Sequence, residues 1–169
     1  MNIITKFTVA TEEGLEILLR LTRELATEKF TPLLGRQELE RYIAENFNAK
    51  TLVVDINSMS NQWLVVYADQ QPAGYARITA NGIKPKPLLG KRAMRIADFG
   101  VLQKYQEQSI RHSLLEKCLA VCSSYEGIWI NEYPGNPVVG LFENKGFIRQ
   151  PDACQLDELP LASVCLIKQ

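Results

Sequence analysis

The fold is decided by three neighbouring stretches: MRIADFGVL at residues 94–102, SIRHSLLEKCLAVC at 109–122 and GIWI at 127–130. The first and the third carry β-branched and aromatic residues and predict strands, whereas the second repeats apolar residues at helical spacing. Two strands that are joined by a crossover helix run parallel in one sheet. No other part of the chain requires parallel strands, so we expect a mixed sheet.

The remaining sequence predicts elements that extend this unit on both sides. Expected strands are residues 3–9, 63–67, 73–78, 147–148 and 162–167, and expected helices are 11–27, 36–46 and 138–144. A turn at residues 69–72 joins two of these strands as an antiparallel hairpin. The segment 82–90 contains two prolines and two lysines, which indicates a surface loop rather than a linker between domains.

This order of elements predicts an α+β fold in which a mixed, mostly antiparallel, twisted sheet is flanked by helices. The chain has 169 residues, of which 46% are hydrophobic and 22% charged, the balance of an ordinary globular protein. That length is enough to bury one stable core. We therefore expect residues 1–169 to form a single domain.

The charge balance argues against several classes of partner. Nineteen basic and nineteen acidic side chains cancel, so there is no net positive charge to hold nucleic acid or an anionic membrane. No long apolar run or signal-like N-terminus is present, and we expect a cytoplasmic protein. The cysteines are spaced neither as metal-binding pairs nor as a disulfide framework, so no metal site is predicted. Buried apolar roles are expected for Cys118, Cys122, Cys154 and Cys165.

Three stretches carry a resemblance to a known family: WLVVYADQQPAGY at 63–75, VLQKYQEQSIRHSLL at 101–115 and NPVVGLFENKGF at 136–147. The first resembles a hairpin that ends in Gly and an aromatic residue. The second has the length and flanks of a cofactor loop written Q/R-x-x-G-x-G/A, and the third resembles a short helix closed by Gly-Phe. Together they resemble the GNAT superfamily of N-acetyltransferases over essentially the whole chain.

The resemblance implies the GNAT acyl-CoA N-acyltransferase fold and acetyl-CoA as cosubstrate. A loop that leads into a helix offers unpaired N–H groups and the positive end of the helix dipole to a pyrophosphate. The residues that match this loop are Gln106, Glu107, Gln108, Ser109, Ile110 and Arg111.

The same resemblance places further cosubstrate contacts on the preceding strand and in the closing signature. Backbone groups of Phe99, Gly100 and Val101 would meet the pantetheine arm and the acyl carbonyl. Asn136 and Phe142 match the asparagine and the aromatic residue of the closing signature.

Two glycines of the family's loop are replaced here by Ser109 and Arg111. The Arg111 side chain could pair with a phosphate, or it could lie across the groove and close it. Glu107 adds a negative charge beside the expected phosphate site. An alternative interpretation is an ordinary helix start that is capped by Ser109.

Direct transfer of an acyl group to an amine needs a base for the ammonium and an acid for the leaving thiolate. The family often supplies the acid as a tyrosine at the position of Phe142, which cannot donate a proton. Asp98 and Glu132 are the candidate bases, and Tyr133 is the candidate acid. Solvated edge charges and simple aromatic packing remain the alternatives for these residues.

Two functions follow from these observations. The first is an acetyltransferase that moves an acetyl group from acetyl-CoA to the amine of a small molecule. The second is a non-catalytic GNAT-fold protein whose degenerate cleft serves ligand binding or interaction, because fold alone does not fix function. A homodimer formed through the final strands is compatible with both.

Overall fold

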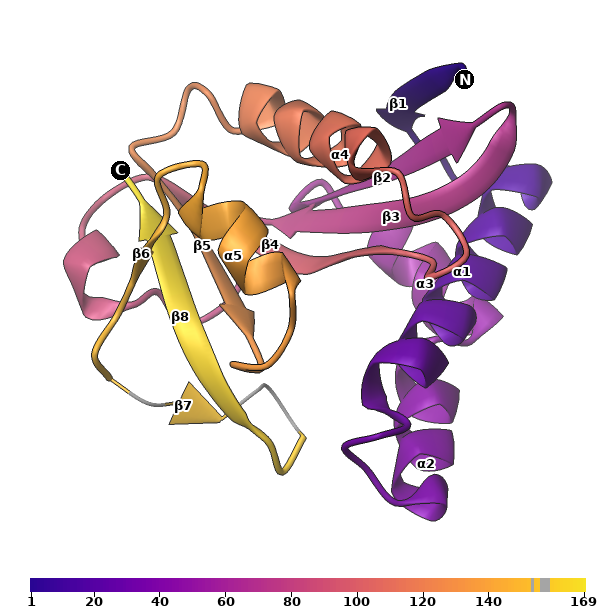
Figure 1. The fold of residues 1–169 in the computed structure, drawn as a ribbon, viewed down its shortest axis with the longest axis horizontal. Helices are drawn as coiled ribbons and strands as arrows, with labels where there is room; N and C mark the ends of the chain where they lie inside the picture. The colour runs from indigo at the N-terminus through magenta and orange to yellow at the C-terminus, as the bar shows by residue number, and fades with distance from the viewer. Residues whose placement is uncertain (153, 156–158) are drawn as a thin grey trace.

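The computed structural model describes residues 1–152, 154–155 and 159–169, which form one sheet with helices on both faces (Figure 1). Its strands are β1 (Ile3–Phe7), β2 (Asn61–Ala68), β3 (Gln71–Thr79), β4 (Ala93–Val101), β5 (Gly127–Glu132), β6 (Ile148–Arg149), β7 (Cys154–Gln155) and β8 (Ala162–Lys168). Its helices are α1 (Glu12–Phe30), α2 (Arg36–Asn46), α3 (Ala49–Ile56), α4 (Gln108–Val121) and α5 (Val138–Glu143), with a 3₁₀ turn at Lys86–Leu88.

The sheet has the mixed topology that the sequence predicts. Its strands follow the order β1-β2-β3-β4-β5-β8-β6, and β7 pairs with β8 beside that path. β4 and β5 are parallel and α4 connects them, while the other recorded pairs are antiparallel. The prediction of a mixed, mostly antiparallel sheet flanked by helices is therefore confirmed.

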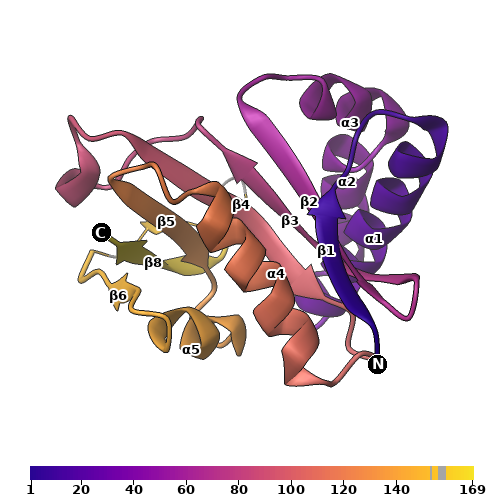
Figure 2. The ribbon, with the colours of Figure 1, turned by 90° about the horizontal axis from the view of Figure 1, so that it is seen from above.

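Alternating side chains of β2 show why both faces of the sheet are covered. Leu64 and Val66 lie in the core on the α4 side, whereas Trp63 and Val65 lie in the core beneath α1 and α3. Figure 2 shows α4 on one side of these strands and α1 to α3 on the other. Because successive strand residues point to opposite faces, one apolar strand can support both layers.

Helix α3 was not predicted from the sequence, where a less regular stretch was expected after α2. The structure shows that α2 ends at Asn46, with Phe47 as its C-cap, and that Asn48 is the N-cap of a new helix. The Asn48 side chain caps α3 by accepting a hydrogen bond from the Thr51 N–H at 2.9 Å. β-Branched residues within the helix, including the exposed Val54, obscure its pattern.

The ends of three elements differ from the prediction by one to three residues. β1 ends at Phe7 rather than at residue 9, and α1 continues to Phe30, one turn beyond its expected end. β6 starts at Ile148 because Phe147 belongs to the core.

Within the described residues, no helix is long and apolar enough to cross a bilayer. Three cysteines are buried, and the side chain of Cys154 lies outside the described part.

Candidate functional site

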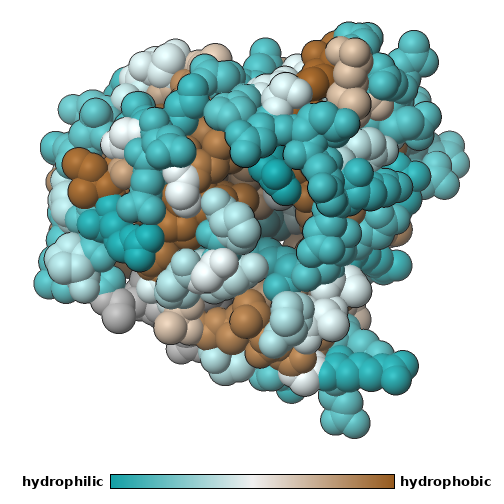
Figure 3. Space-filling view, viewed as in Figure 1, coloured by the Kyte–Doolittle hydropathy of each residue, from teal (hydrophilic) through white to brown (hydrophobic). Residues whose placement is uncertain are grey.

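A cleft opens where β4 and β5 separate. The two strands pair at Ala93↔Gly127, Met94↔Ile128 and Arg95↔Trp129, and no pair is recorded beyond these three. The walls of the cleft come from α1, the second half of β4, the first turns of α4 and the segment after β5. Figure 3 shows this face of the molecule hollowed, with hydrophobic side chains on one side of the hollow and hydrophilic ones on the other.

A bulge in β4 directs a carboxylate into the cleft. Arg77 pairs with Asp98 while the next residue of β3 pairs with Ile96, so Ala97 is an extra residue. Ile96 and Phe99 both belong to the core on the α4 side, which shows that the alternation shifts by one residue between them. Asp98 therefore lines the cleft. Without the bulge it would share the face of Ile96 and be buried among apolar side chains.

Asp98 accepts two hydrogen bonds that fix its orientation. Its Oδ1 accepts from the Phe99 N–H at 3.0 Å, and its Oδ2 accepts from the Tyr75 hydroxyl. Tyr75 is buried and stacks on Trp63 with ring centroids 5.6 Å apart. Burial, and then the nearby Asp98 carboxylate, hold the pKa of Tyr75 well above its usual range. Tyr75 is therefore a neutral donor that positions Asp98.

A second carboxylate, Glu132 at the end of β5, is held in a buried ion pair. The Nζ of Lys29 lies 2.7 Å from its Oε1 and 2.8 Å from its Oε2. The Tyr133 N–H donates to Oε1 at 3.2 Å, and Asn136 adds a side-chain hydrogen bond. The Lys29 and Glu132 side chains are only 17% and 2% exposed.

Burial and charge act in opposite directions on this pair. Burial raises the pKa of Glu132, and the neighbouring Lys29 opposes that change. Burial lowers the pKa of Lys29, but the charges of Glu132 and Asp98 outweigh it, so the pKa of Lys29 is raised. Lys29 is thus an ammonium ion that neutralises Glu132.

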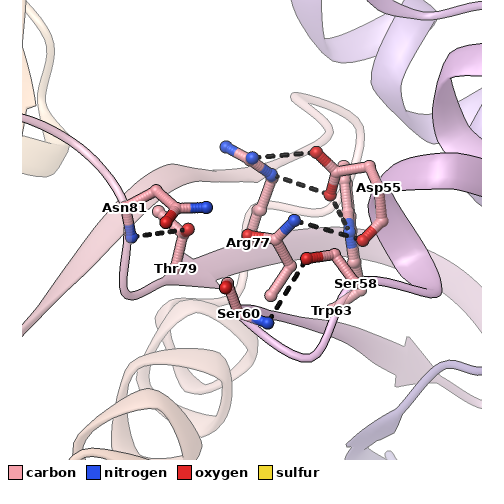
Figure 4. A network of polar contacts seen from close by, with 8 residues as sticks. Asp55, Ser58, Ser60, Trp63, Arg77, Thr79 and Asn81 are labelled. Carbon is pink, nitrogen blue, oxygen red and sulfur yellow. Dashed lines mark hydrogen bonds and ion pairs between the residues drawn. The ribbon is translucent and has the colours of Figure 1, made fainter.

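A second cleft also includes Asp98 in its lining. Figure 4 shows the polar network that borders this second cleft. Arg77 donates to both carboxylate oxygens of Asp55, from Nε at 3.0 Å and from Nη2 at 2.8 Å. The Trp63 Nε1–H donates to the same carboxylate at 2.7 Å. Asp55 belongs to α3, and since that helix was not predicted, the sequence did not suggest this network.

The first turn of α4 is open to solvent, and Arg111 faces the cleft. The helix starts at Gln108 after Glu107, whose side chain makes no capping hydrogen bond. Ser109 lies inside the first turn, so the alternative in which it caps the helix is wrong. Arg111 lines the cleft and makes no hydrogen bond or ion pair with the residues that the structure describes.

A family model described as an acetyltransferase (GNAT) domain matches residues 18–162. The chain belongs to the GNAT acetyltransferase family. The match covers most of the chain, including the elements that build the cleft.

Solved structures share the GNAT fold of this chain. A PaiA N-acetyltransferase from Thermoplasma acidophilum in complex with coenzyme A has a TM-score of 0.75 and 16% identity, with 100% of this chain and 99% of that chain covered. A GNAT acetyltransferase from Streptococcus pneumoniae gives 0.65 and 15%, covering 99% and 98%. An acyl-CoA N-acyltransferase from Pseudomonas aeruginosa gives 0.63 and 12%, covering 99% and 100%. At these identities the likeness shows the fold.

The structure of this GNAT domain brings together part of the set that the sequence suggested. The following predicted residues line the cleft: Asp98, Phe99, Gly100, Val101, Arg111, Tyr133 and Asn136. Exposed positions before and in the first turn of α4 hold Gln106, Glu107, Gln108 and Ser109. Ile110 is in the core.

Phe142 and Glu132 lie behind the surface of the GNAT cleft. Phe142 is fully buried and packs edge-on against Phe99 and Phe147, with ring centroids 5.1 and 4.9 Å apart. Glu132 is covered by Lys29, which, like Tyr75, was not identified from the sequence.

Proposed function

We propose that this chain is an N-acetyltransferase that moves an acetyl group from acetyl-CoA to the amine of a small molecule by direct transfer. The observation that carries the proposal is the cleft where β4 and β5 separate. It is bordered by the backbone of β4, by the cation Arg111 and by the carboxylate Asp98. Family membership and a coenzyme A complex of the same fold support it.

The cosubstrate end of the site is the first turn of α4 with Arg111. Unpaired N–H groups at a helix N-terminus and a guanidinium without a carboxylate partner both favour an anion such as a pyrophosphate. Acetyl-CoA supplies the activated acyl group there. The edge of β4 that faces away from β3, near Gly100, offers backbone groups to an extended arm.

The acceptor end is centred on Asp98. Because Asp98 borders both clefts, it can meet an amine that enters from the side of α2 and α3. Its carboxylate takes the proton from the acceptor ammonium, and the neutral amine then attacks the thioester. Glu132 is less suited to this role because its side chain is only 2% exposed and does not line the cleft.

Tyr133 supplies the proton for the leaving thiolate in this scheme. It lines the cleft next to Glu132, and burial together with that carboxylate raises the pKa of Tyr133. The phenol is therefore protonated at neutral pH and able to donate. This assignment replaces the tyrosine that the family often carries where this chain has Phe142.

The second candidate function is a non-catalytic GNAT-fold protein that uses the cleft for another ligand. Ser109 and Arg111 at the glycine positions of the loop favour it, because bulky residues there keep a phosphate farther from the backbone. The loss of a hydroxyl at Phe142 favours it as well.

Calorimetric titration with acetyl-CoA and with CoA separates the two functions. We expect saturable binding of both, weakened by Arg111→Glu. Lys104→Glu is the matched control, because it makes the same charge change on an exposed residue in the loop before α4, outside the cleft lining. Thiol release from acetyl-CoA in a screen of small amines then tests turnover. Absence of binding at millimolar ligand would refute the transferase.

A further inference from the structure

The amine of Lys29 sits in a pocket that is built for a cation. Besides the two oxygens of Glu132 at 2.7 and 2.8 Å, Nζ lies 5.2 Å from the ring centre of Phe30 and 6.0 Å from that of Tyr133. Aromatic faces attract ammonium groups at these distances, more strongly when water is excluded. Asp98 adds a second negative charge nearby. These groups form what we call the ammonium pocket: Phe30, Asp98, Glu132 and Tyr133.

The ammonium pocket belongs to the cleft in which the transfer is proposed. Lys29, Phe30, Asp98 and Tyr133 all line that cleft, and Glu132 lies directly beneath Lys29. Lys29 reaches the pocket from the last turn of α1. Its tip is a primary alkylammonium, which is the chemical group that the proposed acceptor carries.

We propose that the ammonium pocket is the subsite for a primary alkylammonium group of the acceptor, that Lys29 fills it in the free protein, and that the acceptor binds by displacing Lys29. This inference rests on the proposed function and assigns the class of acceptor. It also gives Lys29 a role as an internal competitor.

Exchange of one ammonium for another keeps Glu132 neutralised. A neutral or anionic molecule that displaced Lys29 would leave a buried carboxylate without a counter-ion, which is strongly unfavourable. The displaced Lys29 gains hydration, since its side chain is already partly exposed at the cleft. The pocket therefore selects for cations and against neutral isosteres.

The test shortens Lys29 and supplies the missing group as n-propylamine. Lys29→Ala removes three methylenes and the amine, which n-propylammonium restores. At about ten times its Kd, n-propylammonium should raise the Tm of Lys29→Ala by about 3 to 5 °C. 1-Propanol, which has the same length and no charge, should raise it by far less.

Two variants serve as controls. Lys145→Ala removes the lysine of an exposed ion pair with Glu116, so n-propylammonium should leave its Tm unchanged. Lys29→Ala/Glu132→Gln lacks the buried charge and should lose the response. The proposal fails if n-propylammonium raises the Tm of Lys29→Ala no more than that of Lys145→Ala.

The wild-type protein gives a second test that does not depend on the folding of a variant. In protein with ¹⁵N-labelled lysine, burial should slow exchange of the Lys29 ammonium protons and make their signal observable. Titration with n-propylammonium should abolish this signal, whereas 1-propanol should not. A Lys29 signal that persists unchanged throughout the titration overturns displacement.

Neither experiment contains acetyl-CoA, so its outcome is distinguishable from that of the proposed function. If n-propylammonium stabilises Lys29→Ala but acetyl-CoA does not bind, the ammonium subsite is supported and the proposed acetyltransferase function is refuted. Acetyl-CoA turnover with no response to n-propylammonium would keep the transferase and refute the subsite.

Discussion

The two ends of the cleft treat their charges differently. At the α4 end, Arg111 makes no hydrogen bond or ion pair with the described residues, and the N-cap residue Glu107 makes no side-chain capping bond. At the α1 end, Glu132 has partners on both oxygens and Asp98 accepts two hydrogen bonds. Polar groups at the α4 end depend on solvent or a ligand for hydrogen-bond partners, whereas those at the α1 end have partners within the protein.

The two ends should therefore affect different properties of the protein: the α4 end its affinity for a ligand, and the α1 end its stability and the arrangement of the reacting groups. Polar groups that lack protein partners can give their full interaction energy to an anion, while groups that already have partners can bind only by exchange. We therefore expect substitutions at the α4 end to change ligand affinity, and substitutions at the α1 end to change stability or the chemical step.

The largest effect should come from breaking the buried ion pair. Lys29→Met leaves Glu132 without a cation, which should lower the free energy of unfolding by about 3–5 kcal/mol in urea denaturation. The control Lys145→Met breaks the exposed pair with Glu116 and should cost less than about 1 kcal/mol. Equal losses of unfolding free energy in the two variants would contradict the view that the ion pair at the α1 end stabilises the fold.

The pH dependence of Lys29→Met sharpens the same point. Burial already raises the pKa of Glu132, and loss of the lysine that opposes this change should raise it further. A raised folded-state pKa means that stability is present at low pH and is lost as pH rises through that pKa. The deficit of Lys29→Met relative to wild type should therefore be smaller at pH 5 than at pH 8.

The next largest effect should be on the chemical step. Asp98→Asn keeps the size of the side chain but removes the proton acceptor, so kcat should fall about 100-fold with acetyl-CoA binding unchanged. Steady-state thiol release with the best acceptor measures this loss. Tyr75→Phe removes only a hydrogen bond to Asp98 and should cost less. A kcat within about twofold of wild type would exclude Asp98 as the base.

A smaller effect is expected at the open end of the cleft. Arg111→Ala should weaken CoA binding about tenfold, because one charge-assisted hydrogen bond to a phosphate is lost. The change should shrink as salt is raised, since ions screen an exposed charge. Calorimetry at two ionic strengths measures both effects, with unaltered stability as the control. Unchanged affinity would remove Arg111 from the cosubstrate site.

The smallest effect concerns Cys122, the buried residue that follows the last turn of α4. Burial raises the pKa of the Cys122 thiol to about 11. Because the folded-state pKa is the higher one, this thiol stabilises the fold below pH 9 and loses that contribution as pH rises toward 11. At pH 8, a thiol reagent should modify Cys122 much more slowly in native protein than in urea-unfolded protein, as measured by peptide mapping. Equal rates at Cys122 would show that this residue is accessible in the native protein.

Local pattern was sufficient to predict the unit that carries the fold. The period-2 and helical spacings across residues 94–130 depend on side chains that are near one another in the sequence, and the structure keeps them as β4, α4 and β5. Helix α3 was missed because its only clear start signal is the Asn48 cap, and β-branched residues follow.

The candidate site depends on contacts that local pattern does not contain. Asp98 was predicted as a site residue, but the direction of its side chain depends on the bulge at Ala97. The one sequence signal for that bulge is that two residues, rather than one, separate the core residues Ile96 and Phe99. Lys29 lies beyond the expected end of the first helix and meets Glu132 across 103 residues of sequence. Nothing in either segment alone indicates that pairing.

The separation of β4 from β5 also conceals a sheet edge. Beyond Arg95 and Trp129 these strands do not pair with each other, so β4 has no strand partner on the side of the cleft. At a protein surface such an edge invites strands of other molecules and promotes aggregation. Here α1 and the segment after β5 wall it in. The surrounding elements thus shield this edge of β4 from the strands of other molecules.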